Sequence, residues 1–196
     1  MMTRVGGGGH EKRLEAHIVN YADDLVICCR GRAEEALAIM RNMMSKLKLT
    51  VNETKTRVCR LPEEKFDFLG YTFGRCFSPK TGRAYIGTVP SKKRVIRICA
   101  AVSEMTERKQ TLLDQEMVVA KLNRTMLGWA NYFCLGPVST AYRAVEQHAS
   151  KRLLQWLCAK HKVMSGTKRF SEASLYGVLG LVRLTKRTRT LPWATS

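Results

Sequence analysis

The chain has 196 residues, 45% of them hydrophobic, which is enough for one domain or two small domains with a core. Its apolar runs are far shorter than the roughly 20 residues of a membrane span. The N-terminal segment also lacks the apolar stretch of a signal peptide, so we expect a cytoplasmic protein. The formal net charge is +18, and residues 75–196 carry 22 basic against 6 acidic side chains.

This charge predicts a polyanionic partner. A domain so basic repels itself unless a polyanion neutralises it, and nucleic acid is favoured over a membrane because no single basic amphipathic helix dominates. A basic surface without a partner is the alternative. The seven cysteines form no Cys-x-x-Cys pair and predict reduced thiols, and Cys158 and His161 have a metal-like spacing without a second pair.

The first predicted elements are a tail and a β-hairpin. Residues 1–16 are expected to be a flexible tail, whose four glycines lack the context of a phosphate-binding loop. The hairpin is expected from strands His17–Tyr21 and Leu25–Arg30, with Asp23 and Asp24 at the turn. Aspartate is common in turns because its side chain can bond the local backbone, which explains one acidic residue better than two.

A helix and further strands are expected next. Between residues 32 and 49 the apolar period is helical, and a core-facing stripe is predicted from Leu37, Met40, Met44 and Leu47. Residues 52–61 are predicted to lead into another strand, and residues 66–73, FDFLGYTF, to be strand again. The Pro-Lys-Thr-Gly turn within residues 78–90 is typical of a connection between two strands.

Beyond residue 90 the pattern becomes helical. Helices are predicted over Lys92–Arg108, Asp114–Phe133 and Val138–Lys162, followed by a short helix near 171–178 and a basic tail. The third helix should bury a stripe of Tyr142, Val145, Ala149, Leu153 and Trp156, and turn outward Arg143, Lys151, Lys160 and Lys162. The expected boundary between a nearly neutral β-rich part and a basic helical part lies near residue 90.

The acidic pair at the hairpin tip admits two interpretations. Adjacent carboxylates repel unless a cation lies between them, and Mg²⁺ prefers oxygen ligands that it shares with substrate phosphates. Two such ions can activate a 3′-hydroxyl and stabilise the departing pyrophosphate. The four-residue motif YADD at 21–24, taken alone, is equally compatible with nucleotidyl transfer and with an ordinary turn.

Longer motifs resemble one family. The order YADD, helix, LKLTVNETKT and FDFLGYTF is similar to the end of a reverse-transcriptase palm. LNRTMLGWANYF at 122–133 resembles the signature of the maturase-specific domain of group II intron proteins, as do AYRAVEQHASKRLLQWLCAKHK and LYGVLGLVRL. The resemblance covers about residues 17–193.

The resemblance implies roles for particular residues. Asp23 and Asp24 would be catalytic ligands of two Mg²⁺ ions, and Tyr21 and Ala22 would place the turn beneath the primer end. Asn52 and Lys55 would border the nucleotide site, and Phe68, Leu69 and Gly70 would form the primer-grip turn. The thumb would hold the template–primer duplex and intron RNA with a basic face that includes Lys92, Lys93, Arg94, Lys121, Arg124, Arg143, Lys151, Lys160 and Lys162.

Two aromatic residues and a glycine of the maturase signature are interpreted structurally. We expect Trp129 and Phe133 to be core rather than RNA-stacking residues, and Gly128 to allow close packing of helices.

The chain also departs from the family pattern. The fingers and the palm strand with a third metal-binding carboxylate should precede the hairpin, where an unrelated-looking tail stands instead, so polymerase activity is not expected from this chain without a fingers–palm polypeptide. The sequence therefore predicts an α+β protein with a tail (1–16), a partial palm (17–90) and a helical thumb or maturase domain with a basic tail (91–196). Its expected role is to bind intron RNA and template–primer in support of splicing and RNA-directed DNA synthesis. The alternatives are a degenerate remnant that acts only as an RNA-binding module, and a DNA-binding protein.

Overall fold

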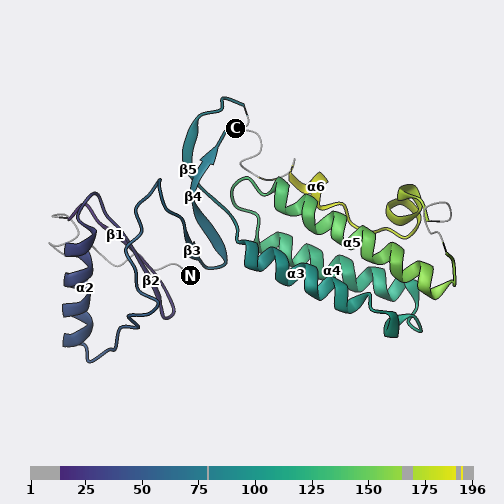
Figure 1. Ribbon diagram of the computed structural model, residues 1–196, viewed down its shortest axis with the longest axis horizontal. Helices are drawn as coiled ribbons and strands as arrows, with labels where there is room; N and C mark the ends of the chain where they lie inside the picture. The colour runs from purple at the N-terminus through teal and green to yellow at the C-terminus, as the bar shows by residue number, and fades with distance from the viewer. Residues whose placement is uncertain (1–13, 79, 165–169, 189–190, 192–196) are drawn as a thin grey trace. The chain divides into compact units, whose positions relative to one another are not determined.

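The chain forms two compact units, residues 1–60 and 61–196, which divide the predicted palm segment 17–90 between them. The computed structural model describes residues 14–78, 80–164, 170–188 and 191 (Figure 1). Two small antiparallel sheets and a set of helices confirm the α+β prediction. Within the described ranges, no helix is both long and apolar enough to span a bilayer.

The first unit consists of a hairpin and one helix. β1 (His17–Tyr21) pairs antiparallel with β2 (Asp24–Cys28), and Tyr21 lies opposite Asp24. The strands are rich in β-branched residues, which suit a half-buried pleated surface. α2 (Ala33–Lys46) has acidic residues in its first turn and Lys46 in its last, the distribution that the helix dipole favours.

The core of the first unit is small. The predicted tail lies outside the described residues up to residue 13, but Leu14 and Ala16 are buried and pack with Ala36 of α2. The predicted core stripe of α2 is wrong at Leu47, which is 64% exposed, while the rest of the stripe is half-buried. Ala36 and Ile39 face this small core instead, where they pack with Leu14, Ala16 and Ile27.

The strand into which residues 52–61 are predicted to lead is not present, since among the described residues no strand forms between this segment and the strand that begins at Phe66. Asn52 organises the segment as a turn, since its backbone oxygen accepts hydrogen bonds from the N–H groups of Lys55 at 3.1 Å and Thr56 at 3.0 Å. The local side-chain bonds of Asn and Thr compete with a sheet ladder in this way.

The second unit begins with a three-stranded antiparallel sheet in the order β3-β4-β5. β3 (Phe66–Phe68), β4 (Tyr71–Phe77) and β5 (Ala84–Pro90) follow one another along the chain, and the turn at Leu69 and Gly70 splits the predicted continuous strand 66–73. Phe66 lies opposite Phe73, and their rings stack with centroids 5.1 Å apart.

The helices that follow pack around one core. α3 (Lys92–Met105), the 3₁₀ helix η1 (Arg108–Gln110), α4 (Gln115–Tyr132) and α5 (Ser139–Lys160) precede a π-helical turn η2 (Ser174–Val178) and α6 (Leu184–Arg187). α3 and α4 both contact α5 (Figure 1). The predicted stripe of α5 is confirmed, since every member is at most 1% exposed.

The prediction that Gly128 allows close packing of two helices is wrong, because no helix in the described part of the chain lies against this residue. The glycine is exposed on α4, and a Cβ added to it would meet no atom within 4 Å. It lies four residues after Arg124 on the helix and therefore on the same exposed face, away from the buried face of Leu122, Met126 and Ala130.

Candidate nucleic-acid interface

The tip of the β1–β2 hairpin exposes the two aspartates. Because Tyr21 pairs with Asp24, only Ala22 and Asp23 form the turn, and Tyr21 is 52% exposed. Ala22 has a φ of +49°, a left-handed conformation that costs a residue with a Cβ about 1–2 kcal/mol. Turns that need a positive φ usually use glycine or asparagine. An alanine held in this conformation favours a functional constraint over an ordinary turn.

The two aspartates have the ligand chemistry of a magnesium site. Exposed carboxylates are the hard oxygen donors that Mg²⁺ prefers, so Asp23 and Asp24 fit the chemistry of such an ion. Among the residues that the structure describes, no group of three or more His, Cys, Asp or Glu side chains is placed to hold a metal. Substrate phosphates or a further carboxylate would have to complete the coordination.

Asn52 and Lys55 lie in the turn that follows α2. The Asn52 side-chain oxygen accepts hydrogen bonds from Thr54 Oγ1 at 2.7 Å and from the Lys55 N–H at 3.2 Å. Glu53 anchors the turn to α2 through an ion pair with Arg41 at 2.5 Å. Lys55 is exposed, and its ammonium has no partner among the described side chains.

The turn between β3 and β4 is fixed to the end of α4. Leu69 and Gly70 both have a positive φ, +51° and +83°. The Tyr132 hydroxyl donates to the Leu69 carbonyl at 2.9 Å, and the Tyr71 hydroxyl donates to the Tyr132 carbonyl at 2.6 Å. The Ser91 N–H donates to the Gly70 carbonyl at 2.9 Å. The turn predicted to border the primer is therefore rigidly joined to the helices of this unit.

Gly70 brings this turn against a basic residue and an aromatic ring. A Cβ at position 70 would lie 2.9 Å from Arg94 Nε and 3.2 Å from Phe133 Cζ. The positive φ favours glycine here, and any larger residue would also have to displace the Arg94 side chain. The structure thus places the predicted primer-site residue Gly70 beside the predicted RNA-binding residue Arg94.

The start of α3 concentrates positive charge. Lys92, Lys93 and Arg94 occupy its first turn, which contains no acidic residue, and all three are exposed. Cations at the N-terminus of a helix oppose its dipole, which costs stability at this position. The arrangement strongly attracts anions, because the free N–H groups and the side chains have the same sign of charge.

The remaining predicted RNA-binding residues are exposed, with one exception. Lys160 is half-buried, and its Nζ donates to the carbonyl oxygens of Thr111 at 3.0 Å and Leu113 at 2.7 Å. The expectation that Lys160 faces outward is wrong, because the loop before α4 lies against the end of α5. The other side chains have no partner in the described part of the chain: Lys92, Lys93, Arg94, Lys121, Arg124, Arg143, Lys151 and Lys162.

The aromatic residues of the maturase signature belong to the core. Phe133 is 5% exposed, and Trp129 is half-buried with its ring centroid 5.1 Å from that of Phe133 and 5.9 Å from that of Tyr142. Tyr142 donates to the Ala130 carbonyl at 2.8 Å, and burial raises its pKa to about 12. These contacts support the structural interpretation of Trp129 and Phe133.

Sequence reasoning missed the residues that join the sheet to the helices. Tyr71 and Tyr132, 61 positions apart in the sequence, form this connection, and burial raises the pKa of the Tyr71 hydroxyl. Their aromatic character is visible in the two motifs, but nothing in the sequence shows that the motifs meet. Arg97, also exposed on α3, extends the basic surface of Lys93 one helical turn further.

Comparison with protein families assigns both halves. Residues 2–73 match the model of the reverse transcriptase (RNA-dependent DNA polymerase), and residues 95–174 match that of the group II intron, maturase-specific domain. The chain belongs to the group II intron reverse transcriptases and maturases. Among curated proteins no match to the chain was found.

The family matches also correct one interpretation. The reverse-transcriptase match begins at residue 2, so residues 2–16 are not an unrelated tail. The acidic pair and the 68–70 turn lie inside this match, and most of the basic helical residues lie inside the maturase match. Reverse transcriptases in general depend on divalent metals, and the two domains imply binding of intron RNA and of template and primer.

Proposed function

We propose that the helical unit of this maturase binds group II intron RNA and template–primer duplex in the cytoplasm, in support of splicing and of RNA-directed DNA synthesis. One observation carries the proposal. The exposed basic residues of α3, α4 and α5 have no carboxylate partners in the described part of the chain. RNA phosphates can neutralise these charges, and the release of counterions then drives binding.

Catalysis is the second part of the proposal. Asp23 and Asp24 would hold Mg²⁺ at the primer end, where the ion supplies activation of the 3′-hydroxyl and neutralises phosphate charge. Among the described residues, the site has two carboxylates and no group of three potential metal ligands. The first unit has a small core and exposes apolar residues such as Met43, Leu47 and Leu49. These features support a palm that is completed by a fingers–palm polypeptide. The alternative is an RNA-binding module without catalysis.

Charge reversal tests the proposed RNA binding. Replacing Arg143 and Lys151 together by Glu should weaken the affinity for intron RNA by about tenfold or more, because both are exposed and unpaired among the described residues. The matched control is the double replacement of Lys46 and Lys48 by Glu in the first unit, which changes the net charge equally. At physiological salt the control should stay within about twofold of the native chain, since Lys46 and Lys48 lie outside the helical unit and charges that do not contact the RNA are screened. Equal losses in both variants would contradict the proposal.

Primer extension on an RNA template with Mg²⁺ tests the catalytic part. The 196-residue chain alone should give no detectable product, because ions held by two carboxylates are poorly positioned and a 1 Å error can cost about 100-fold in rate. Adding a fingers–palm fragment of a related protein should give product. Asp23→Asn should abolish that product, whereas Glu63→Gln, at an exposed carboxylate of the second unit, should not. Product from the chain alone, or from the Asp23→Asn variant, would refute this part.

A further inference from the structure

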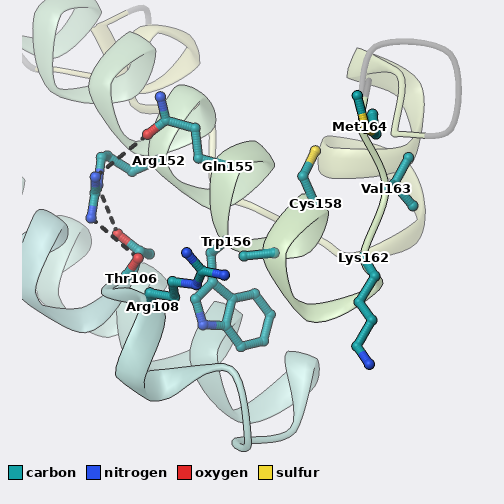
Figure 2. A pocket seen from close by; sticks show the side chains of 10 residues that line it. Thr106, Arg108, Arg152, Gln155, Trp156, Cys158, Lys162, Val163 and Met164 are labelled. Carbon is teal, nitrogen blue, oxygen red and sulfur yellow. Dashed lines mark hydrogen bonds between the residues drawn. The ribbon is translucent and has the colours of Figure 1, made fainter.

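A pocket of about 480 Å³ lies where the end of α3, η1 and the last turns of α5 meet (Figure 2). Its lining includes Thr106, Arg108, Arg152, Gln155, Trp156 and Lys162, and none of the lining residues is acidic. This volume falls within the range of about 300–1,000 Å³ that is usual for small-molecule sites. Of the predicted RNA-binding residues only Lys162 lines the pocket, so the family motifs do not account for it.

Arg152 forms a fixed cationic wall of the pocket. Its Nε donates to Thr106 Oγ1 at 3.1 Å, and its Nη2 donates to the carbonyl oxygens of Ser103 at 2.9 Å and Thr106 at 3.2 Å. Its Nη1 makes a longer bond of 3.4 Å to Gln155 Oε1, which Figure 2 also shows. All of these acceptors are neutral. The guanidinium is therefore held in place while its charge remains uncompensated by a carboxylate.

Two further basic side chains at the pocket make no ion pair in the described part of the chain. Neither Arg108 nor Lys162 has a side-chain partner in the described part of the chain, and both are exposed. Lys162 has a φ of +52° and ends α5 in a Schellman motif, in which the Val163 N–H donates to the Cys158 carbonyl at 3.0 Å. This position usually holds glycine, because a side chain there is strained. A lysine in place of glycine brings an ammonium group to the pocket at a cost in stability.

The pocket also offers hydrogen-bonding groups. Gln155 is exposed, and its side-chain amide can donate and accept, as the edge of a nucleobase requires. Trp156, which is 1% exposed, lies at the pocket, and its indole N–H has no acceptor among the described residues. Buried donors are rarely left unpaired, so an acceptor from a ligand or a water is expected next to this one.

We propose that this pocket receives one unpaired nucleotide of an RNA strand bound by the helical unit. The phosphate lies between Arg108 and Lys162, and the edge of the base meets the Gln155 amide. Proteins recognise RNA sequence mostly on single-stranded nucleotides whose bases are splayed out, and the pocket has room for one nucleotide but not for a duplex. The inference rests on the proposed RNA binding and adds to it a preference for an unpaired nucleotide.

Affinity for single-stranded and double-stranded RNA tests the inference. The native 196-residue chain is titrated with a single strand of about 12 nucleotides that cannot pair with itself and with a duplex of the same length. Arg108→Ala combined with Lys162→Ala should lower the affinity for the single strand about tenfold or more. Lys109→Ala combined with Lys186→Ala removes the same charge from exposed residues that do not line the pocket and should change it about twofold at most. For the duplex the two double variants should behave alike.

A charge-neutral variant separates the pocket from general electrostatics. Ala159 lines the pocket and is exposed, so Ala159→Phe should occupy the space of the base and reduce single-strand affinity, whereas Ala144→Phe on the same helix should not. Equal behaviour of the pocket and control variants, with RNA still bound, would overturn the pocket inference and leave the proposed function standing. If the native chain bound neither RNA, both would be overturned. Binding of free adenosine monophosphate that only the pocket variants lose would assign the pocket to a free nucleotide and contradict the RNA strand as its source.

Discussion

Two glycines with similar backbone angles have different neighbours. Gly82 has a φ of +66° and nothing within 4 Å of an added Cβ, whereas Gly136 has a φ of +74° and an added Cβ would clash with the Thr88 carbonyl oxygen. Both positions thus require a left-handed backbone conformation, which favours glycine. The close approach to β5 belongs to Gly136 alone, and it holds the segment after α4 against the sheet.

Alanine substitutions at these glycines separate the two effects. Gly82→Ala should lower the free energy of unfolding by about 1–2 kcal/mol, the cost of a left-handed alanine. Gly136→Ala should lower it by about 3 kcal/mol or more, because an overpacking cost of about 1–3 kcal/mol adds to the conformational one. Chemical denaturation of both variants measures the difference. Equal losses would show that the loop relaxes away from β5 without penalty.

At the scale of elements, helices were easier to predict than the contacts between them. The period of apolar residues indicated α5 correctly, because its buried side depends on its own sequence. The alternating aromatic pattern of residues 66–73 predicts a continuous strand, and only the family resemblance indicates a turn at Leu69 and Gly70. That turn is held by Tyr132, 63 residues further along the chain. Lys160 was misplaced for the same reason, because its acceptors lie in a distant loop. Non-local hydrogen bonds of this kind leave no periodic signal in the sequence.

Gly128 provides a test on α4. Because an added methyl group meets no atom, Gly128→Ala should raise the free energy of unfolding by about 0.8–1 kcal/mol through helix propensity alone. For a chain of this size that corresponds to an increase in Tm of about 2–4 °C. Thermal melting without RNA provides the measurement. A decrease in Tm would instead support the original interpretation of Gly128 as a packing residue.

At the scale of the whole molecule, the sequence indicates the protein family and the kind of chemistry more reliably than it indicates which residues lie together in space. The motifs around Asp23 and Trp129 indicated a reverse transcriptase and a maturase domain, and the family matches agree with both. The pocket beside Arg108 could not be predicted, because its walls come from three separate elements and no motif joins them. The two compact units also differ in core size: three described residues are buried in the first cluster, and the helical unit has a large core.

The salt dependence of intron RNA binding tests the central claim most directly. The affinity of the 196-residue chain is measured at a series of salt concentrations, and log K is plotted against log salt. If four to eight phosphates contact the exposed basic residues of the helical unit, the slope should be about −3 to −6. A slope shallower than about −1 would mean that few phosphates are contacted, and it would contradict RNA binding through these unpaired charges.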